Sequence, residues 1–143
     1  MLELYMIGLI VQDMRKSLEF YRQLGIAIPE GSEEQTHVEV KMGSGLTFFL
    51  DSRPSRWDPG FVRKDDQGRM KASDSYSSIL EFYLKTQDAV DAKYKELTSL
   101  GYQGHRAPYE TSFGMYFALI NDPDGNIILL SGDLEENETS KAR

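Results

Sequence analysis

A five-residue turn between two apolar runs constrains the fold of this chain more than any other feature. The turn sequence Asp-Pro-Asp-Gly-Asn occupies residues 122–126 and separates the apolar runs at 115–120 and 127–130. Asp-Pro and Asp-Gly are strong turn signals, because proline restricts φ and glycine accepts a positive φ. Both runs are rich in strand-forming residues and are apolar on both faces. The sequence therefore predicts a buried β-hairpin against which the rest of the chain packs.

Two stretches have the start, spacing and end of an amphipathic helix. In the first, Asp13 is a candidate N-cap, the apolar residues Met14, Leu18 and Tyr21 follow at helical spacing, and Gly25 stands where a helix ends. In the second, Asp88 is expected to open the helix and Gly101 to close it. The apolar positions of this second helix are Val90, Tyr94 and Leu97.

The predicted strands fall around these helices in the same order twice. In the first half we expect strands at 4–11, 26–28, 36–42 and 46–50, and in the second at 79–84, 102–109 and the two arms of the hairpin. The order β-α-β-β-β therefore occurs twice, which indicates a duplication. The predicted fold is α+β, a single domain over 1–143. It comprises a first module at 3–52, a long inter-module loop at 53–78, a second module at 79–133 and a flexible tail at 134–143.

Composition excludes several classes of function. The net charge is −7, and a protein that binds phosphate backbones needs a surplus of Lys and Arg, so we expect no nucleic-acid partner. No apolar run approaches the roughly 18 residues of a membrane-spanning helix, so we expect no membrane partner. The chain has no cysteine and opens without a basic leader region, which predicts a cytoplasmic protein.

Several motifs, in this order around a repeated module, resemble the vicinal oxygen chelate superfamily of glyoxalases, extradiol dioxygenases and bleomycin-resistance proteins. They lie at residues 10–13, 17–21, 24–25, 113–114 and 122–126. The resemblance implies two βαβββ modules that curve around a shared cleft. It also implies a homodimer, as is frequent among relatives.

The resemblance also locates the metal ligands of the enzymes in the family, which are usually His, Glu or Gln. Carried over by position, they fall at Met6, Ile79 and Leu129, with the remaining one near Phe49 or Asp51. Thioether and alkyl side chains do not replace charged or imidazole donors for the divalent metals of such sites. We therefore predict no metal and no cofactor. The two histidines, His37 and His105, are interpreted as ordinary surface residues.

Alternate residues of a strand share a face, so the ligand positions also indicate which side chains line the cleft. The polar members of that lining are Asp51, Glu81, Tyr83 and Ser131. Glu81 stands among apolar neighbours, and an isolated buried carboxylate is costly unless it is paired. We expect it to form a salt bridge, to bind a cationic ligand or to act as a base with a raised pKa. Aromatic side chains that could stack on a planar ligand, or could belong to the core, are Trp57, Tyr83, Phe113 and Tyr116.

These observations favour a metal-free small-molecule binding protein of the bleomycin- or mitomycin-resistance type, which sequesters a planar hydrophobic or cationic compound. The predicted ligand-binding residues are Met6, Phe49, Asp51, Trp57, Ile79, Glu81, Tyr83, Phe113 and Leu129. One alternative is a metal-dependent glyoxalase- or dioxygenase-like enzyme with displaced ligands. A second is a regulatory or interaction module without a small ligand.

Overall fold

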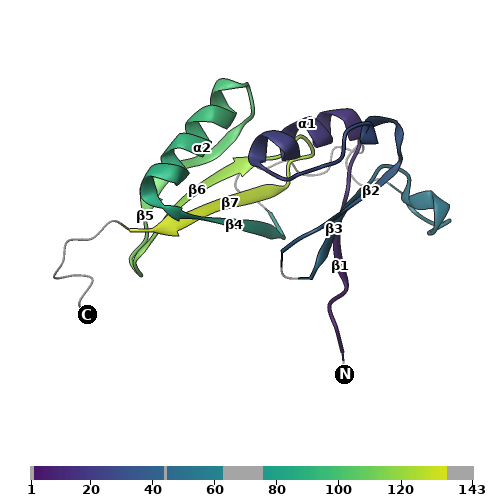
Figure 1. The fold of residues 1–143 in the computed structure, drawn as a ribbon, viewed down its shortest axis with the longest axis horizontal. Coiled ribbons are helices and arrows are strands. Elements are labelled where there is room, and N and C mark those ends of the chain that lie inside the picture. The colour runs from purple at the N-terminus through teal and green to yellow at the C-terminus, as the bar shows by residue number, and fades with distance from the viewer. Residues whose placement is uncertain (1, 44, 63–75, 135–143) are drawn as a thin grey trace. The chain divides into compact units, whose positions relative to one another are not determined.

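The structure is a computed structural model, and it describes residues 2–43, 45–62 and 76–134 (Figure 1). The chain divides into two compact units, Met1–Lys71 and Ala72–Arg143, and each is described by itself. Much of the predicted loop at 53–78 and nearly all of the predicted tail at 134–143 lie outside the described residues. The mixed α+β class predicted from the sequence is confirmed, with one α-helix and one sheet in the described part of each unit.

The first unit contains a three-stranded sheet in the order β1-β3-β2. Strands β1 and β3 are parallel, whereas β2 and β3 are antiparallel. Helix α1 connects β1 to the rest of the unit. The elements are β1 (Met6–Ile10), α1 (Met14–Leu24), the 3-10 helix η1 (Ser32–Glu34), β2 (His37–Lys41), β3 (Thr47–Asp51) and the 3-10 helix η2 (Pro54–Arg56).

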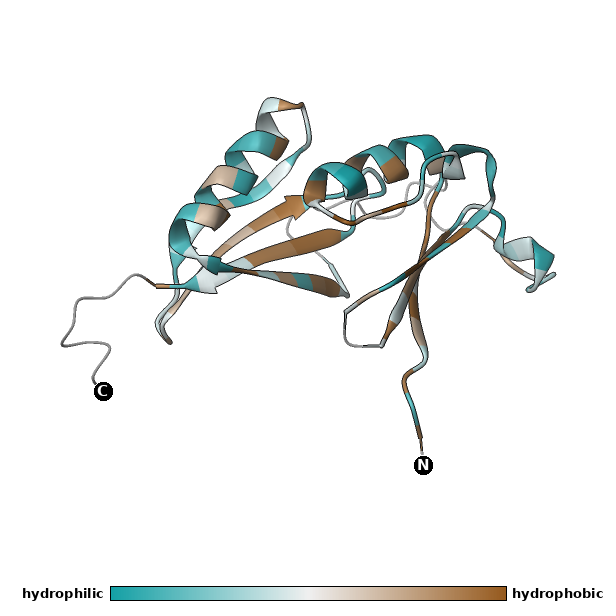
Figure 2. Cartoon of the chain, in the orientation of Figure 1, coloured by the Kyte–Doolittle hydropathy of each residue, from teal (hydrophilic) through white to brown (hydrophobic). Residues whose placement is uncertain are grey.

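The second unit contains a four-stranded sheet in the order β4-β7-β6-β5. Its first and last strands, β4 and β7, are parallel, and the remaining neighbours are antiparallel. Figure 2 shows that β6 and β7 form a hydrophobic band through the centre of this sheet. The elements are β4 (Ile79–Thr86), α2 (Gln87–Ser99), β5 (Gly104–Glu110), β6 (Met115–Asn121) and β7 (Ile127–Asp133).

The predicted hairpin is confirmed, and the buried carboxylate of Asp122 holds its turn together. Oδ1 of Asp122 accepts hydrogen bonds from the backbone N–H groups of Asp124 and Asn126, at 2.9 and 2.8 Å, and Oδ2 accepts from Nδ2 of Asn126 at 2.9 Å. Gly125 has φ +89°, which only glycine adopts without strain. This turn joins β6, in which Ala118, Leu119 and Ile120 are buried, to β7, which is buried at every residue except Asp133.

The helix ends agree with the sequence in the first unit more closely than in the second. Asp13 caps α1 through its side chain, which accepts from the backbone N–H of Lys16, and Gly25 ends the helix with φ +128°. In α2 the expected N-cap, Asp88, is wrong. The helix begins earlier, because the hydroxyl of Thr86 accepts from the backbone N–H of Ala89 at 3.0 Å.

The strand predicted at 26–28 is not observed, so the described part of the first module has three strands where the sequence predicted four. The backbone of this segment has other partners. The N–H of Ile26 donates to the carbonyl of Tyr21 in the last turn of α1, and the N–H of Ile28 donates to the carbonyl of Ile26. The Ile26 and Ile28 side chains are buried nevertheless, so their apolar pattern reflects packing and not strand pairing.

Each sheet packs its helix on one face only. In the first unit, Phe48 of β3 lies against Tyr21 of α1, with ring centroids 5.5 Å apart. In the second unit, the hydroxyl of Tyr116 on β6 donates to Asp91 of α2. Strand neighbours alternate between faces, so the opposite face of each sheet carries no helix of its own unit.

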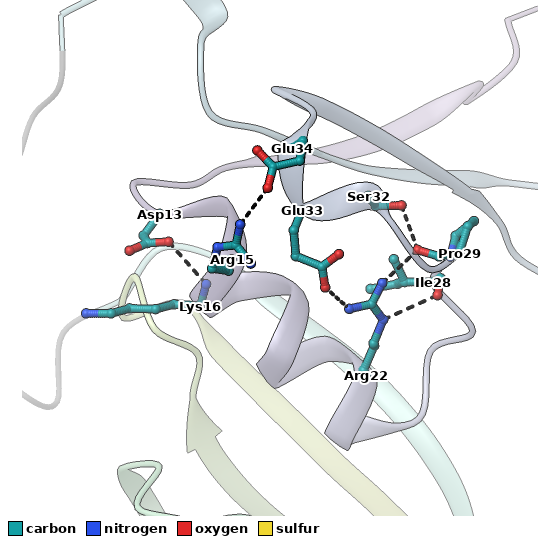
Figure 3. Close-up of polar contacts among 9 residues, drawn as sticks. All are labelled: Asp13, Arg15, Lys16, Arg22, Ile28, Pro29, Ser32, Glu33 and Glu34. Carbon is teal, nitrogen blue, oxygen red and sulfur yellow. Dashed lines mark hydrogen bonds and ion pairs between the residues drawn. The ribbon is translucent and has the colours of Figure 1, made fainter.

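Arg22 ties α1 to the segment that follows it, as Figure 3 shows. Its Nε donates to the carbonyl of Ile28 at 3.3 Å, Nη2 donates to the carbonyl of Pro29 at 2.7 Å, and Nη1 pairs with Glu33. Arg15 on the same helix makes only one ion pair, with Glu34, and both of these side chains are largely exposed. The partly buried Arg22 therefore fixes a segment that lacks strand hydrogen bonds.

We predict that Arg22→Ala lowers the free energy of unfolding by about 1–3 kcal/mol, because it removes the hydrogen bonds to the Ile28 and Pro29 carbonyls and the ion pair with Glu33. The matched variant Arg15→Ala removes an exposed pair and should change it by less than about 1 kcal/mol. Urea denaturation of the three proteins measures both values. Equal losses in the two variants would contradict the role assigned to Arg22.

Candidate functional site

The helix-free face of the first sheet brings together residues from all three of its strands. Phe49 of β3 is the direct neighbour of Gly8 on β1 and Glu39 on β2. The Phe49 ring lies over Gly8 so closely that a Cβ on Gly8 would stand 2.0 Å from it. His37 lies on the same face, with its ring centroid 4.9 Å from that of Phe49. The absence of a side chain on Gly8 is what allows the ring to lie flat on the sheet.

The carboxylate of Asp51, the last residue of β3, makes hydrogen bonds to three other residues. Asp51 is only 1% exposed, yet both of its oxygens are hydrogen-bonded. Oδ1 accepts from the backbone N–H of Arg53 at 2.7 Å. Oδ2 lies 2.7 Å from Nδ1 of His37 and accepts from Nε1 of Trp57 at 3.1 Å. Asp51 therefore joins β3, β2 and the chain that follows β3.

The surroundings of Asp51 keep it ionised. Burial disfavours its charge, but the hydrogen bonds from His37, Trp57 and the Arg53 backbone outweigh burial and lower the pKa of its carboxyl group. Burial likewise opposes the charge of His37, but its bonds to Asp51 and Glu39 outweigh that effect and raise the pKa of the imidazole. The pair therefore favours an imidazolium next to a carboxylate.

His37 and Glu39 were missed as site residues by the sequence analysis, which interpreted them as part of a solvated strand face. Nε2 of His37 lies 2.9 Å from Oε2 of Glu39, while Nδ1 faces Asp51. The only sequence signal was their alternation along one strand, which does not reveal the partner on the neighbouring strand. The cross-strand register, His37 opposite Asp51, is what creates the cluster.

The helix-free face of the second sheet carries an apolar cluster of Leu119, Ile127 and Leu129, against which Tyr109 and Phe117 pack. Leu129 is buried, whereas Ile79 on the neighbouring strand is partly exposed. Phe113 precedes β6 and meets Phe117 edge-on, with centroids 5.8 Å apart. Three predicted residues of the second module, Ile79, Phe113 and Leu129, thus lie on or beside this cluster.

Two expectations about polar and aromatic residues of the second unit are corrected. Glu81 is exposed, so the burial that singled it out is not observed. Tyr116 points to the helix side, where its bond to Asp91 raises the pKa of its hydroxyl to about 12, and it does not belong to the helix-free face. Tyr83 does belong to it. Its hydroxyl donates to Asp133 at 2.7 Å, and that bond raises its pKa.

The residues at the positions where the resemblance places metal ligands do not fit a divalent cation. Met6 is paired with Thr47, so Asp51 stands four residues further along β3 and cannot converge with Met6. Asp51 already holds three donors, and both nitrogens of His37 face carboxylates. Among the residues that the structure describes, no group of three or more His, Asp or Glu side chains is arranged to hold a metal ion. Ile79 and Leu129 supply no donor atom.

Comparison with known proteins establishes the family. The sequence model of the Glyoxalase/Bleomycin resistance protein/Dioxygenase superfamily matches residues 4–130, so the chain belongs to this superfamily. None of the curated proteins compared with it matches in sequence.

Solved structures share its fold at low sequence identity. A glyoxalase-related enzyme from Fulvimarina pelagi superposes with a TM-score of 0.73 at 19% identity, covering 93% of this chain and 89% of that one. A family enzyme from Burkholderia phytofirmans gives 0.72 at 19% identity, covering 93% and 100%. A lactoylglutathione lyase from Agrobacterium tumefaciens gives 0.61 at 18% identity, covering 91% and 92%. These similarities show the fold alone.

Within residues 2–43, 45–62 and 76–134, neither helix is both long and apolar enough to cross a bilayer.

We predict that Asp51→Asn lowers the free energy of unfolding by about 1–3 kcal/mol, because it removes the charge that His37 and two N–H groups are arranged to bind. The control Glu39→Gln makes the same chemical change at the other, half-exposed partner of His37 and should cost less than about 1 kcal/mol. Chemical denaturation followed by tryptophan fluorescence measures both. A larger loss in the Glu39 variant would overturn the central position given to Asp51.

The two pKa shifts predict how the stability provided by His37 depends on pH. The raised pKa of His37 makes its contribution complete below about pH 6.5, and it is lost as pH rises through the folded-state pKa. The lowered pKa of Asp51 makes its contribution present above about pH 3.9, and it is lost as pH falls through the folded-state pKa. The stability difference between wild type and His37→Gln should therefore be largest between these values.

Unfolding free energies measured from acid to mildly alkaline pH test this expectation. His105→Gln removes the other histidine and serves as the control, whose difference from wild type should lack that maximum. A difference between wild type and His37→Gln that is constant over the whole range would contradict the charged pair.

Proposed function

We propose that this protein is a metal-free small-molecule binding protein, related in function to the bleomycin- and mitomycin-resistance proteins, which sequesters a planar hydrophobic or cationic compound. The proposal extends a family membership that includes resistance proteins as well as enzymes. It takes the helix-free sheet faces as the binding surfaces, because the predicted ligand-binding residues Phe49, Asp51 and Trp57 lie on or beside one, and Leu129 lies on the other.

The observation that carries the proposal is that Trp57 is exposed while a hydrogen bond fixes its orientation. Trp57 is 58% exposed, although its indole N–H donates a hydrogen bond to the buried carboxylate of Asp51. An exposed aromatic ring whose orientation is held by a buried anchor is prepared for stacking, since less conformational freedom is lost when a ligand binds. A flat ring system is the ligand shape that such a surface favours.

The charges near Trp57 favour a cation. Asp51 and Glu39 carry two negative charges against the single positive charge of His37, and the whole chain has a net charge of −7. A cationic ring system stacked on the indole would gain both the cation–π attraction and this negative field.

The donor chemistry supports binding without a metal. The positions implied for metal ligands hold a thioether and alkyl side chains, and the carboxylate and imidazole nearest to them bind each other. This arrangement favours the sequestering role over the enzyme with displaced ligands. The exposed aromatic surface likewise favours a ligand over an interaction module with a collapsed face.

We predict that a planar aromatic cation, with proflavine as the probe, binds the protein and quenches the emission of Trp57. Trp57 is the only tryptophan of the chain, so quenching reports on this position directly. Trp57→Leu should weaken binding about threefold to tenfold, as expected for the loss of one cation–π contact. Calorimetric titration measures the affinity of both proteins.

The control is Tyr5→Leu, which removes an exposed aromatic side chain outside the Asp51 cluster and should leave the affinity unchanged. Absence of quenching, or an equal loss in the two variants, would contradict the proposed stacking site. Elemental analysis of the dialysed protein provides an independent test. About one tightly bound divalent metal ion per chain would contradict the metal-free proposal.

A further inference from the structure

Two carboxylates of the first sheet, Asp51 and Glu39, belong to the cluster around His37, and only one of them is open to a ligand. Both oxygens of Asp51 are hydrogen-bonded, and the residue is 1% exposed. The side chain of Glu39 is 45% exposed, and its Oε2 lies 2.9 Å from Nε2 of His37. Among the residues that the structure describes, Oε1 of Glu39 has no hydrogen-bond partner. Glu39 therefore retains an acceptor that a bound molecule can use.

The surface around Glu39 is accessible. Its row across the sheet continues with Phe49, which is partly exposed, and ends at Gly8, which is exposed. Trp57 exposes more than half of its surface. A ligand can thus reach both the Glu39 carboxylate and the Trp57 ring without displacing any side chain from the core.

The indole of Trp57 and the carboxylate of Glu39 are joined by a short chain of polar contacts. The indole N–H and Nδ1 of His37 meet the same oxygen of Asp51, and Nε2 of His37 meets Glu39. Each contact is about 3 Å long and the imidazole ring is narrower still, so the indole nitrogen and Oε2 of Glu39 are at most about 11 Å apart. A molecule of three fused rings spans that distance.

A neighbouring positive charge determines which way a cationic ligand points. Arg56 directly precedes Trp57 and is exposed, and its Nη1 donates to Oγ1 of Thr36 at 2.7 Å. Like charges repel and opposite charges attract, so a cationic group is driven away from Arg56 and towards Glu39. The charged end of a ligand stacked on Trp57 is therefore expected at Glu39.

We infer that Glu39 binds the ligand directly and selects a planar cation that carries N–H groups over a fully alkylated cation of the same shape. An N–H group donates a charge-assisted hydrogen bond to the free carboxylate oxygen, whereas an alkylated cation has the charge but no donor. In this arrangement Asp51 holds the aromatic rings in position, and Glu39 makes the polar contact. The inference rests on the proposed small-molecule function and adds to it the chemical class of the compound.

Calorimetric titration with two dyes tests the inference. Proflavine has N–H groups, whereas 3,6-bis(dimethylamino)-10-methylacridinium has the same three rings and the same charge but no N–H group. Glu39→Gln should weaken the binding of proflavine about tenfold, because His37 occupies the one amide oxygen and the ligand meets an NH₂ group instead. It should weaken the methylated dye only about twofold, since that dye loses nothing but the charge attraction of an exposed carboxylate.

Lys41→Gln is the matched control, because Lys41 lies two residues beyond Glu39 on the same face of β2 and is exposed. Among the described residues, the ion pair of Glu39 is with His37 and not with Lys41. Removal of this positive charge should tighten the binding of both dyes by the same factor, up to about twofold. The ratio of the two affinities should therefore stay as it is in the wild type.

The outcomes separate this inference from the proposed function. If Glu39→Gln changes the affinities for both dyes by the same factor, Glu39 does not select N–H groups, and the inference is wrong while the stacking site at Trp57 stands. If Lys41→Gln alters the affinity ratio as much as Glu39→Gln does, the preference comes from the overall charge of the strand, which also contradicts the inference. If neither dye binds the wild type, the proposed function itself is overturned.

Discussion

The structure of each unit depends on the parallel pairing of its first and last strands. Parallel neighbours cannot be joined by a tight turn, so the chain has to cross over, and in the described part of each unit the crossover contains its one α-helix. A single helix covers a single face. The opposite face of each sheet is therefore left to side chains alone, and this is where the candidate site residues lie.

On the first sheet those side chains are organised by one ionised group. A buried carboxylate is stable only when donors surround it, and Asp51 obtains three, from His37, Trp57 and the Arg53 backbone. Each donor is thereby held in position. On the second sheet, by contrast, the buried atoms Oγ of Ser131 and Oδ1 of Asn121 have no hydrogen-bond partner among the described residues.

Local signals in the sequence predicted the features that depend on a few neighbouring residues. The turn at 122–126, the N-cap Asp13 and the terminating Gly25 were all correct, because capping and turn preferences act within four or five positions. The strand at 26–28 was wrong for the complementary reason. Its apolar alternation was real, but Tyr21 and Arg22 use its backbone to end and brace α1, which no count of apolar positions reveals.

By itself, the sequence determined the α+β class, the order of strands and helix in the second unit, and the alternation of strand residues between two faces, because helices repeat every 3.6 residues and strands every two. Only the tertiary structure decided which residues meet across strands. In the structure, His37 lies opposite Asp51, and Asp51 lies four residues along β3 from the partner of Met6. Glu81 is exposed, and Ser131 and Asn121 flank the pair Leu119 and Leu129 along the hairpin. Register decides such contacts, and it depends on how whole strands pair and not on the identity of any one residue.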